Sequence, residues 1–464
     1  MGGQYAPRQL YYNGSVQKAT SSKTFQSIDP STGTPLAEIH VASNRDVDAA
    51  ISSATEAFKT WSTTPAIARA RILLKAVQIL RDRNDEIAKV ETQDTGKPFS
   101  ETSTVDVVTG ADVAEYFANL VGGGGLNGET AQLREDAWVY SKKEPLGRIH
   151  PLLGQVPAEI YTEAGVPAGV FNIVNGAGDV GGYLTSHPGI AKVSFTGQVS
   201  TGKKVAGAAA GNMKYVTMEL GGKSPLIVLP DSDLENAVDG AMMANFFSTG
   251  QVCTNGTRVF VHESMKSAFE KRLVEKMQYI RAGDLWDMNT NFGPLVSGVH
   301  REKVLGYIKH GIEVDRATLL YGGLGQPSVP RGLEKGFWVK PTVFTDCTDS
   351  MKIIKEEIFG PVLCILTFSA VDEVIQRAND TPLGLAAGVF TKDLNLAHKV
   401  IGKLEAGITW VNTWGESPAE MSVGGWKQSG MGVENGRRGI EAWVRNKSTL
   451  VDMSGASVTV YSKL

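Results

Sequence analysis

Cys253 lies in the stretch GQVCTNGTR, which is rich in small and polar residues. Free cysteines are most often buried and inert, and Cys347 in TDCTDS and Cys364 in the apolar run VLCILTF fit that description. Cys253 instead follows the turn STGQ and is flanked by Gly, Thr and Asn. A thiol becomes a good nucleophile where backbone dipoles or a nearby base stabilise the thiolate. Two interpretations stay open, a nucleophile and a small packed residue.

Two glutamates have neighbours that suit chemistry. Glu219 in VTMELGGKSP stands between Met218 and Leu220, and a carboxylate in an apolar setting can serve as a general base near neutral pH. Glu357 in EEIFGPV is followed by Phe359 and a Gly-Pro turn, which suits a carboxylate on a ribose and an aromatic ring beside a base. The alternatives are a surface glutamate at a strand end and an ordinary turn.

A glycine turn, FTGQVSTGKK, follows an apolar run at residues 195–204. Its spacing from Gly197 to Lys203 resembles a phosphate-binding P-loop, but Lys204 stands where that motif needs Ser or Thr. A glycine turn between a strand and a helix can still present backbone N–H groups to a pyrophosphate. Cofactor binding and a purely structural turn remain alternatives.

The composition narrows the class of protein. The chain has 464 residues, a formal charge of −3, three cysteines and no CxxC or HExxH spacing. We therefore expect no nucleic-acid or membrane partner, no disulfide framework and no zinc site. No apolar run approaches roughly 20 residues, and no secretory signal is visible at the start. These features favour a protein of a reducing compartment, the cytoplasm.

The hydrophobic pattern predicts the elements that would position these residues. Short strands are expected within 23–43, helices at 46–61 and 70–90, and a hairpin arm after the glycines at 121–125, with strand-like alternation at 137–142. Strands at 169–176, 191–197 and 223–230 with a helix at 232–247 indicate a parallel α/β sheet. A second α/β stretch is expected at 257–400, with strands RVFVH, TVFTD and VLCILTF. A chain of this length holds two or three units.

Six motifs together resemble the NAD(P)-dependent aldehyde dehydrogenases. They are VSFTG, MELGGKSP, GQVCTNGTR, EEIFGPV, ANDTPLGLAAGVF and GGWKQSGMGVENG, in the family's order over nearly the whole chain. The stretches ETQDTGKPFSETSTVDVVTGADV, MMANFFSTGQVCTNGTRVFV and NTWGESPAEM look most like betaine aldehyde dehydrogenases. The trimethylaminobutyraldehyde and aminoaldehyde enzymes are close relatives.

The resemblance implies an α/β fold with three parts and a homo-oligomer, a dimer or a tetramer. These parts are a Rossmann-type cofactor domain (1–120 and 143–220), an oligomerisation arm (121–142 and 446–464) and an α/β catalytic domain (221–445). It also implies that a small aldehyde is oxidised to the carboxylate through a thiohemiacetal and a thioester.

Site residues follow from the same resemblance. Cys253 would be the nucleophile, Glu219 would activate water and Glu434 would join a proton relay, although Val433 replaces the family's usual arginine. Glu357 and Phe359 would hold the nicotinamide ribose of NAD, with NADP not excluded. The rest of the cofactor would lie along Gly176, Gly197, Gln198, Val199, Ser200, Thr201 and Gly202, where Gln198 replaces a small residue. Phe247 and Trp414, with Phe246, would form part of a substrate cage, and potassium would bind at Ser27, Ile28 and Asp94, with a second site near Lys427 and Gly430.

One piece of the family pattern is missing. After Glu144-Pro145-Leu146-Gly147 the family continues with W-N-Y-P and K-P-S, whereas here RIHPLLGQVPAEIY follows directly. The cofactor domain therefore lacks about one strand-helix-strand piece near residue 148, roughly 30 residues. The loss removes an oxyanion-hole asparagine, the lysine that holds the adenosine ribose, and aromatic residues of a cage for trimethylammonium. The alternative to an active enzyme is an impaired or inactive shortened form, or a faulty gene prediction.

Overall fold

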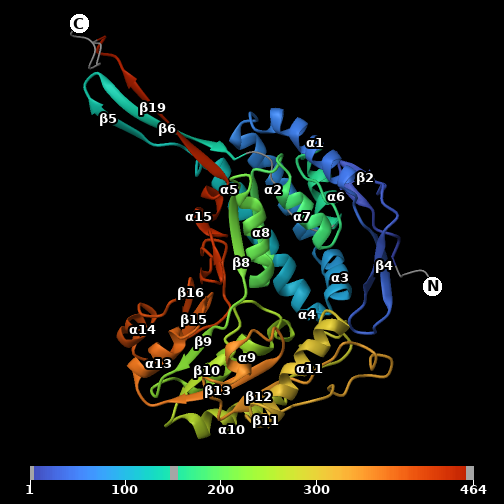
Figure 1. Cartoon of the computed structure of the whole chain (residues 1–464), viewed down its shortest axis with the longest axis vertical. Coiled ribbons are helices and arrows are strands. Elements are labelled where there is room, and N and C mark those ends of the chain that lie inside the picture. The colour runs from blue at the N-terminus through green and yellow to red at the C-terminus, as the bar shows by residue number, and fades with distance from the viewer. Residues whose placement is uncertain (1–4, 147–154, 456–464) are drawn as a thin grey trace.

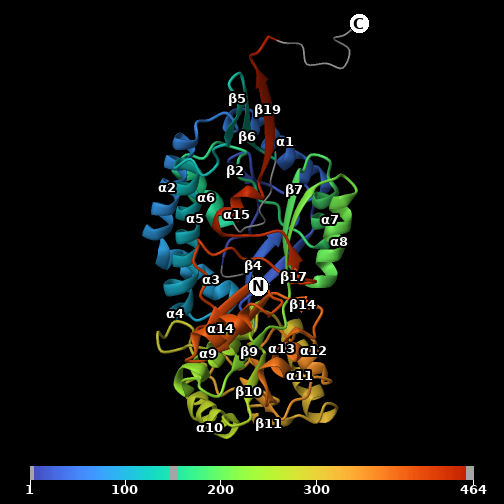
Figure 2. The same cartoon turned by 90° about the vertical axis from the view of Figure 1, so that its left-hand side faces the viewer.

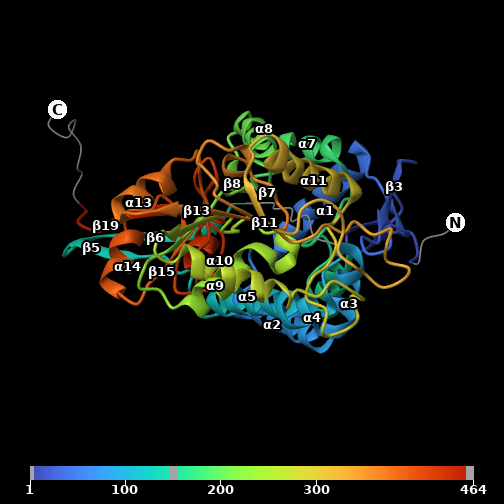
Figure 3. The same cartoon turned by 90° about the horizontal axis from the view of Figure 1, so that it is seen from below.

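The protein is an elongated body with an arm at one end. The computed structural model describes residues 5–146 and 155–455. The arm projects from the top of the body in Figure 1, and a second α/β unit forms the bottom. Viewed from the side, two groups of helices flank the strands of the first unit (Figure 2). Figure 3 shows the same two groups from below.

The first unit begins with hairpins and helices. Their bounds are β1 Leu10–Tyr12, β2 Ser15–Gln17, β3 Thr24–Ile28, β4 Pro35–His40, α1 Asn44–Trp61, α2 Ala66–Asp82, α3 Asn84–Thr95, α4 Phe99–Glu101, a π-helical turn Thr102–Asp106 and α5 Val107–Gly122. Helix α1 starts with a capping box, in which Ser43 and Asp46 satisfy each other's backbone N–H. Its buried face, with Val47 and Ile51, packs in the core as the 3.6-residue spacing predicts.

After the arm, the first unit continues with α6 Gln155–Ala164, α7 Gly178–Ser186, β7 Lys192–Gly197, α8 Val199–Ala210 and β8 Tyr215–Leu220. Strands β7 and β8 are parallel, and β18 (Gly430–Met431) joins β8 antiparallel, giving a three-stranded sheet. Residues far along the chain thus return to complete this sheet.

The second unit is built on a seven-stranded sheet in the order β11-β12-β13-β10-β9-β15-β16, parallel except for β11. Its elements are β9 Pro225–Val228, α9 Leu234–Phe246, a 3-10 turn Phe247–Gly250, β10 Arg258–His262, α10 Lys266–Met277, α11 Gly298–Glu313, β11 Thr318–Tyr321, β12 Thr342–Thr345, α12 Lys352–Lys355, β13 Val362–Phe368, α13 Val371–Asn379, β14 Leu383–Gly384, β15 Ala386–Phe390, α14 Leu394–Ile401 and β16 Ile408–Val411. Every residue of β9, β12 and β15 is buried, as expected of a parallel sheet covered by helices on both faces. The α/β stretch predicted at 257–400 is confirmed as a parallel sheet, but the strands predicted at 191–197 and 223–230 belong to two different sheets, β7 to the three-stranded one and β9 to the seven-stranded one.

The arm is a three-stranded antiparallel sheet of β5 Thr130–Arg134, β6 Ala137–Pro145 and β19 Val444–Asp452. The chain reaches β19 through β17 Trp426–Lys427, β18 and α15 Gly436–Glu441. Strand β6 is central, so β5 and β19 are both edges. The tail assigned to the arm from the sequence, 446–464, lies in β19 up to Asp452, and residues 456–464 lie outside the described part of the chain.

Two predicted elements are wrong. Residues 169–176 form only an isolated bridge between Ile173 and Tyr11, because the strand beside them, β1, has just three residues. The expected helix at 70–90 is two helices, α2 and α3, separated at Arg83. The polar residues after Arg83 favour this break, because the side-chain amide of Asn84 donates hydrogen bonds to the Asp85 carboxylate and to the carbonyl of Ser103.

The predicted gap near residue 148 falls on residues 147–154, which lie outside the described ranges. Among the described residues, β7 pairs only with β8.

Candidate active site

Cys253 sits in the loop that links α9 to β10 and is half-buried. The loop is braced by the side-chain amide of Asn255, which donates to the carbonyl of Gly250 at 2.9 Å. Burial, then the negative charges of Glu357 and Glu219, raises the pKa of the Cys253 thiol to about 11. The backbone N–H groups of Cys253 and Thr254 act the other way. The thiol therefore needs a base to take its proton when the sulfur attacks.

The glycines Gly221 and Gly222 bring three predicted residues together. A Cβ on Gly221 would lie 2.0 Å from Glu357 Oε2, and one on Gly222 would lie 2.7 Å from the carbonyl oxygen of Cys253. The N–H of Gly222 donates to Glu357 Oε1 at 3.3 Å. Because there is no room for a side chain at either glycine, the backbone just after β8, two residues beyond Glu219, lies directly against both Cys253 and Glu357.

Glu219 is half-buried near the end of β8 and pairs in the ladder with Gly430. Burial, and then the charge of Glu434, raises the pKa of Glu219 to about 8. Its Oε1 is buried without a hydrogen-bond partner among the described residues. A carboxyl group that is half-ionised near pH 8 is suited to accept a proton from a thiol or a water.

Glu434 lies beside Glu219 and is held from two directions. Its backbone pairs with Val423 in an antiparallel bridge, and Ser194 Oγ donates to Glu434 Oε1 at 2.6 Å. Lys192 Nζ donates to the Thr217 hydroxyl and lies 4.6 Å from the centre of the Trp443 ring. Burial lowers the pKa of Lys192, while the charge of Glu434 opposes that shift.

The residues predicted along the cofactor lie at the carboxyl end of β7 and the start of α8. Gly197, Gln198, Ser200 and Thr201 are exposed and Val199 is half-buried, while Gly202 is buried where a Cβ would lie 2.5 Å from Leu220. Gly176 is exposed just before α7 and close to Val180. Helix α8 has no acidic residue in its first turn, so its free N–H groups suit a pyrophosphate.

Phe359 takes a left-handed conformation, φ 60°. Its carbonyl oxygen lies 2.6 Å from His300 Nε2, and its ring is half-buried. Glu357 thus borders the glycine pair from the second unit, and Gly202 of α8 packs on Leu220, the residue before the pair, in the first. These two sides fit the nicotinamide ribose and the phosphates of a dinucleotide. The adenosine side lacks the motifs W-N-Y-P and K-P-S.

A cavity of about 1040 Å³ opens between α5, α9 and the loop at 413–420. Five carboxylates line it and no lysine or arginine does: Asp112, Glu115, Asp239, Glu416 and Glu420. Arg81 pairs with Asp112 and Glu115, and Lys276 pairs with Asp239, whereas Glu416 and Glu420 have no cationic partner among the described residues.

Trp414 connects this cavity to the Cys253 loop. It lines the cavity, packs on Trp410 with ring centres 4.9 Å apart, and would meet a Cβ on Gly256 at 2.8 Å. Its indole N–H is buried without a partner in the described structure. Phe247 is half-buried at the end of α9 and Phe246 is buried, but neither lines the cavity.

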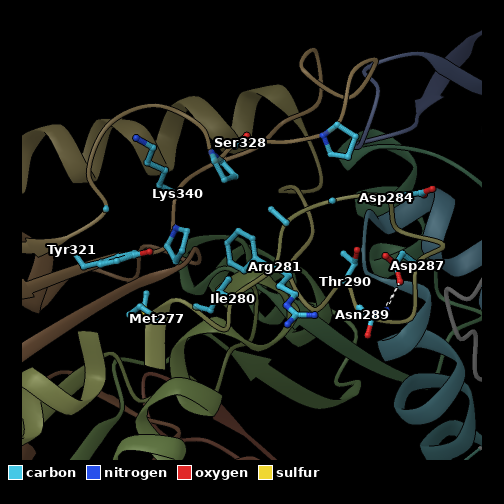
Figure 4. Close-up of a pocket in the computed structure, with 17 residues that line it drawn as sticks. Met277, Ile280, Arg281, Asp284, Asp287, Asn289, Thr290, Tyr321, Ser328 and Lys340 are labelled. Atoms are coloured by element: carbon cyan, nitrogen blue, oxygen red, sulfur yellow. Dashed lines mark hydrogen bonds between the residues drawn. The ribbon is translucent and has the colours of Figure 1, made fainter. Parts of the chain in front are cut away.

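Another cavity, of about 840 Å³, contains none of the predicted site residues. It lies between the segment 277–292 and the loop that ends at Lys340 and Pro341 (Figure 4). Arg281 and Lys340 line it together with Asp284 and Asp287, so its charged groups are balanced. Of the predicted site residues only Trp414 lines either of these two cavities, so the acidic cavity is linked to Cys253 through the contact of Trp414 with Gly256.

The residues predicted to bind potassium form two separate groups. Ser27 Oγ donates to Asp94 Oδ1 at 2.5 Å, with Ile28 next in the strand. Lys427 Nζ donates to the carbonyls of Asn379 and Thr381 and pairs with Glu405 at 2.6 Å, while Gly430 lies against Met218. The described residues contain no group of three or more His, Cys, Asp or Glu side chains arranged to hold a metal. The potassium sites remain predictions.

Sequence reasoning missed the residues that support Glu219. Ser429 is fully buried, donates to the Gly221 carbonyl at 2.8 Å and accepts from the N–H of Gly384 at 2.9 Å. Lys192 and Ser194 flank Glu434 from β7. The only sequence signal for Ser429 is its place in the motif GGWKQSGMG, and a serine among glycines does not by itself predict burial.

The described residues contain no helix long and apolar enough to cross a membrane. The sequence model of the aldehyde dehydrogenase family matches residues 16–153 and 149–449, in two pieces that meet at 149–153.

Solved structures agree with that match. The chain is 31% identical to a putative aldehyde dehydrogenase from Burkholderia cenocepacia, over 98% of this chain and 100% of that one, with a TM-score of 0.94. It is 34% identical to the NAD+ complex of aldehyde dehydrogenase from Bacillus cereus (96% and 97% covered, TM-score 0.91). It is 33% identical to a mutant of the P. syringae indole-3-acetaldehyde dehydrogenase AldA in complex with NAD+ and IAA (96% of each chain covered, TM-score 0.92). With the fold and nearly the full length matched, the chain belongs to the aldehyde dehydrogenase family, whose members are enzymes that oxidise aldehydes with a nicotinamide cofactor.

Proposed function

We propose that this protein oxidises a cationic aldehyde, betaine aldehyde or a related aminoaldehyde, to its carboxylate with NAD+. The observation that carries the proposal is the approach of Glu219, Glu357 and Cys253 around Gly221 and Gly222, where no side chain fits between them. For betaine aldehyde the product is glycine betaine, and a 4-trimethylaminobutyraldehyde or other aminoaldehyde substrate is the nearest alternative.

Cys253 is the proposed nucleophile. Its Sγ bonds to the aldehyde carbon as the thiolate, once the thiol proton, which a pKa of about 11 keeps on the sulfur at neutral pH, has passed to a water molecule. The resulting thiohemiacetal oxygen lies near the backbone N–H groups that face the sulfur, those of Cys253 and Thr254. They replace only part of the oxyanion hole, since the family's asparagine is missing from the sequence.

When bound, NAD+ supplies the two-electron acceptor for the hydride of the substrate carbon. Glu357 and Phe359 are the proposed contacts of the nicotinamide ribose, and the turn Gly197–Gly202 is the proposed contact of the phosphates. After oxidation Glu219 takes a proton from water, whose oxygen attacks the thioester carbon. The C–S bond breaks, the carboxylate leaves and the Cys253 sulfur is restored.

The acidic cavity supports a cationic substrate. Its five carboxylates and the aromatic rings of Tyr116 and Trp414 suit a trimethylammonium or ammonium group, which is attracted both to negative charge and to the face of an aromatic ring. The structurally similar indole-3-acetaldehyde dehydrogenase takes a neutral aldehyde by its name. A panel of cationic and neutral aldehydes therefore tests this part of the proposal separately.

The arm supports a homo-oligomer. Strands β5 and β19 are both edges, and Leu133 and Leu450 on them are exposed. We propose that the arm pairs with a second copy, and that residues up to 220 outside the arm and residues 221–445 act as cofactor and catalytic domains. Potassium at the two predicted sites and a cytoplasmic location are further predictions.

A specific observation favours the alternative of an impaired enzyme. The family match breaks at 149–153, where the sequence lacks W-N-Y-P and K-P-S. The sequence therefore lacks both the lysine that would hold the adenosine ribose and the asparagine that would bind the oxyanion. An inactive chain would keep the fold of the second unit but would not turn over.

The test compares the purified chain with its Cys253→Ala variant, using betaine aldehyde and NAD+ and following NADH formation. Activity in the first, with a loss of at least about a thousandfold in the second, supports the proposal. Equal inactivity of two well-folded proteins would establish the impaired form instead.

A further inference from the structure

The chain is strained immediately before the nucleophile loop. Ser248, Thr249 and Gly250 have φ values of 49°, 54° and 73°, so three successive residues are left-handed. This conformation is unfavourable for residues with a Cβ, and for a β-branched residue such as Thr249 it is rare. Cys253 follows within three residues, so whatever holds this turn also sets where the sulfur lies.

Backbone groups of Gly293 and Gly360 and the side chain of Glu101, all outside the loop, hold the turn. Thr249 Oγ1 donates to the carbonyl of Gly293 at 3.0 Å and accepts from its N–H at 3.2 Å. Gly250 lies so close to Gly360 that a Cβ would meet that backbone at 2.3 Å. Ser248 Oγ donates to Glu101 Oε1, and this bond is buried.

Glu101 comes from the first unit and is itself fixed. It ends the short helix α4, is 8% exposed, and lies with Oε1 3.7 Å from Lys97 Nζ, which pairs with Asp106 at 2.9 Å. Helix α4 is tied to the second unit, because the N–H of Phe99 donates to the Leu285 carbonyl at 2.8 Å and Ser100 Oγ donates to the Thr290 carbonyl at 2.7 Å.

Burying an ionised carboxylate costs free energy unless hydrogen bonds and an opposite charge replace its contacts with water. Burial raises the pKa of Glu101, and the bond from Ser248 and the charge of Lys97 oppose this shift. The turn after Glu101, Thr102–Asp106, is a π-helix, a feature often found at functional sites.

We propose that Glu101 is a positioning residue for Cys253: through the Ser248 hydroxyl it holds the left-handed turn that places the Cys253 backbone against Gly222 and so sets the direction of the sulfur. The proposal rests on the proposed function, because it takes Cys253 as the nucleophile. It predicts that Glu101 acts on the reactivity of the sulfur and only weakly on the affinity for NAD+.

The experiment measures two quantities for Glu101→Leu, Glu101→Gln and Ser248→Ala. They are the kcat and KM values, and the rate at which iodoacetamide alkylates Cys253 without cofactor, followed on the Cys253 peptide by mass spectrometry. Glu101→Leu is expected to lower kcat and the alkylation rate on the order of 10- to 100-fold with little change in the KM for NAD+. Glu101→Gln, which can still accept from Ser248, should recover most of both.

Two comparisons separate positioning from mere stabilisation. Ser248→Ala should reproduce the loss, and the double variant with Glu101→Leu should be no worse than the worse single variant, because both remove one hydrogen bond. Asp106→Asn changes the ion pair between Asp106 and Lys97 but leaves the bond from Ser248 to Glu101 in place. Cys253 in this variant should be alkylated at the native rate. If the Leu variant does not fold, Ser248→Ala and Glu101→Gln still decide the question.

The proposal is overturned if Glu101→Leu and Ser248→Ala lower only the melting temperature, or if their effects on alkylation multiply. Should Cys253→Ala keep its activity, the proposed function fails on its own, while the alkylation rates still report whether Glu101 sets the loop.

Discussion

Two sheets of this protein, the seven-stranded sheet of the second unit and the β18-β8-β7 sheet of the first, border the same site but differ in how completely they are built. In the second unit seven strands are paired and three of them are buried at every position. In the first unit the described sheet has three strands, one of two residues, and β7 is half exposed. Cys253 and Glu357 lie in loops of the second unit, whereas Glu219 and the proposed phosphate contacts belong to the first unit. The difference teaches that the nucleophile is better supported than the base and the phosphate contacts.

The largest expected effect compares one phenylalanine from each sheet. Phe260 is fully buried in β10 and Phe195 is half-buried in β7. Phe260→Ala should cost about 3–5 kcal/mol of unfolding free energy, and Phe195→Ala clearly less. Denaturant unfolding followed by fluorescence measures both. Equal costs would show that the small sheet is as well supported as the large one.

The next effect concerns Glu219, the proposed base near the end of β8. Glu219→Gln should lower kcat about 10²- to 10⁴-fold, because the amide cannot take a proton from water. The raised pKa of Glu219 means that its active, ionised form appears as the pH rises through about 8, so the native kcat should rise over that range. A pH profile of each protein measures this. If kcat of the Gln variant rises over the same pH range, the rise must come from the ionisation of another group.

A third prediction tests the glycine turn of the first unit. Gly202→Val would push into Leu220, whereas Gly207→Val on the same helix faces open space and serves as the control. A ligand that binds only the folded state raises its melting temperature. We expect the increase in melting temperature caused by NAD+ to shrink in the first variant and to stay in the second. The same increase in both would place the cofactor elsewhere.

The smallest expected effect concerns Glu434. Its charge helps to raise the pKa of Glu219, so removing that charge should lower this pKa. Glu434→Gln should therefore move the rising limb of the pH profile to lower pH with a modest change in the maximal rate. A limb that moves to higher pH would contradict the like-charge explanation.

The sequence predicted the second unit well because its strands are continuous apolar runs bounded by turns. VLCILTF and RVFVH are found as β13 and β10. It failed at 169–176, where an apolar run packs beside β1 and makes one bridge. A run of apolar residues predicts that a segment is buried, but the segment forms a β-strand only if its backbone pairs with a neighbouring strand.

The site could be predicted in part for a similar reason. Cys253, Glu219 and Glu357 stand in motifs, and the structure brings them to one place. Ser429, Lys192 and Glu101 could not be found, because each acts through a contact between segments that are far apart in the chain. The Glu101–Ser248 bond joins residues 147 positions apart, a separation that no local pattern encodes.

The central claim is that a thioester forms on Cys253, and its most direct measurement is the mass of the Cys253 peptide after Glu219→Gln protein is mixed with betaine aldehyde and NAD+. Because this variant should be slow to hydrolyse the thioester, the account predicts an added acyl group on Cys253 together with a single burst of NADH. An unmodified Cys253 and no NADH in a protein that still unfolds cooperatively would contradict it.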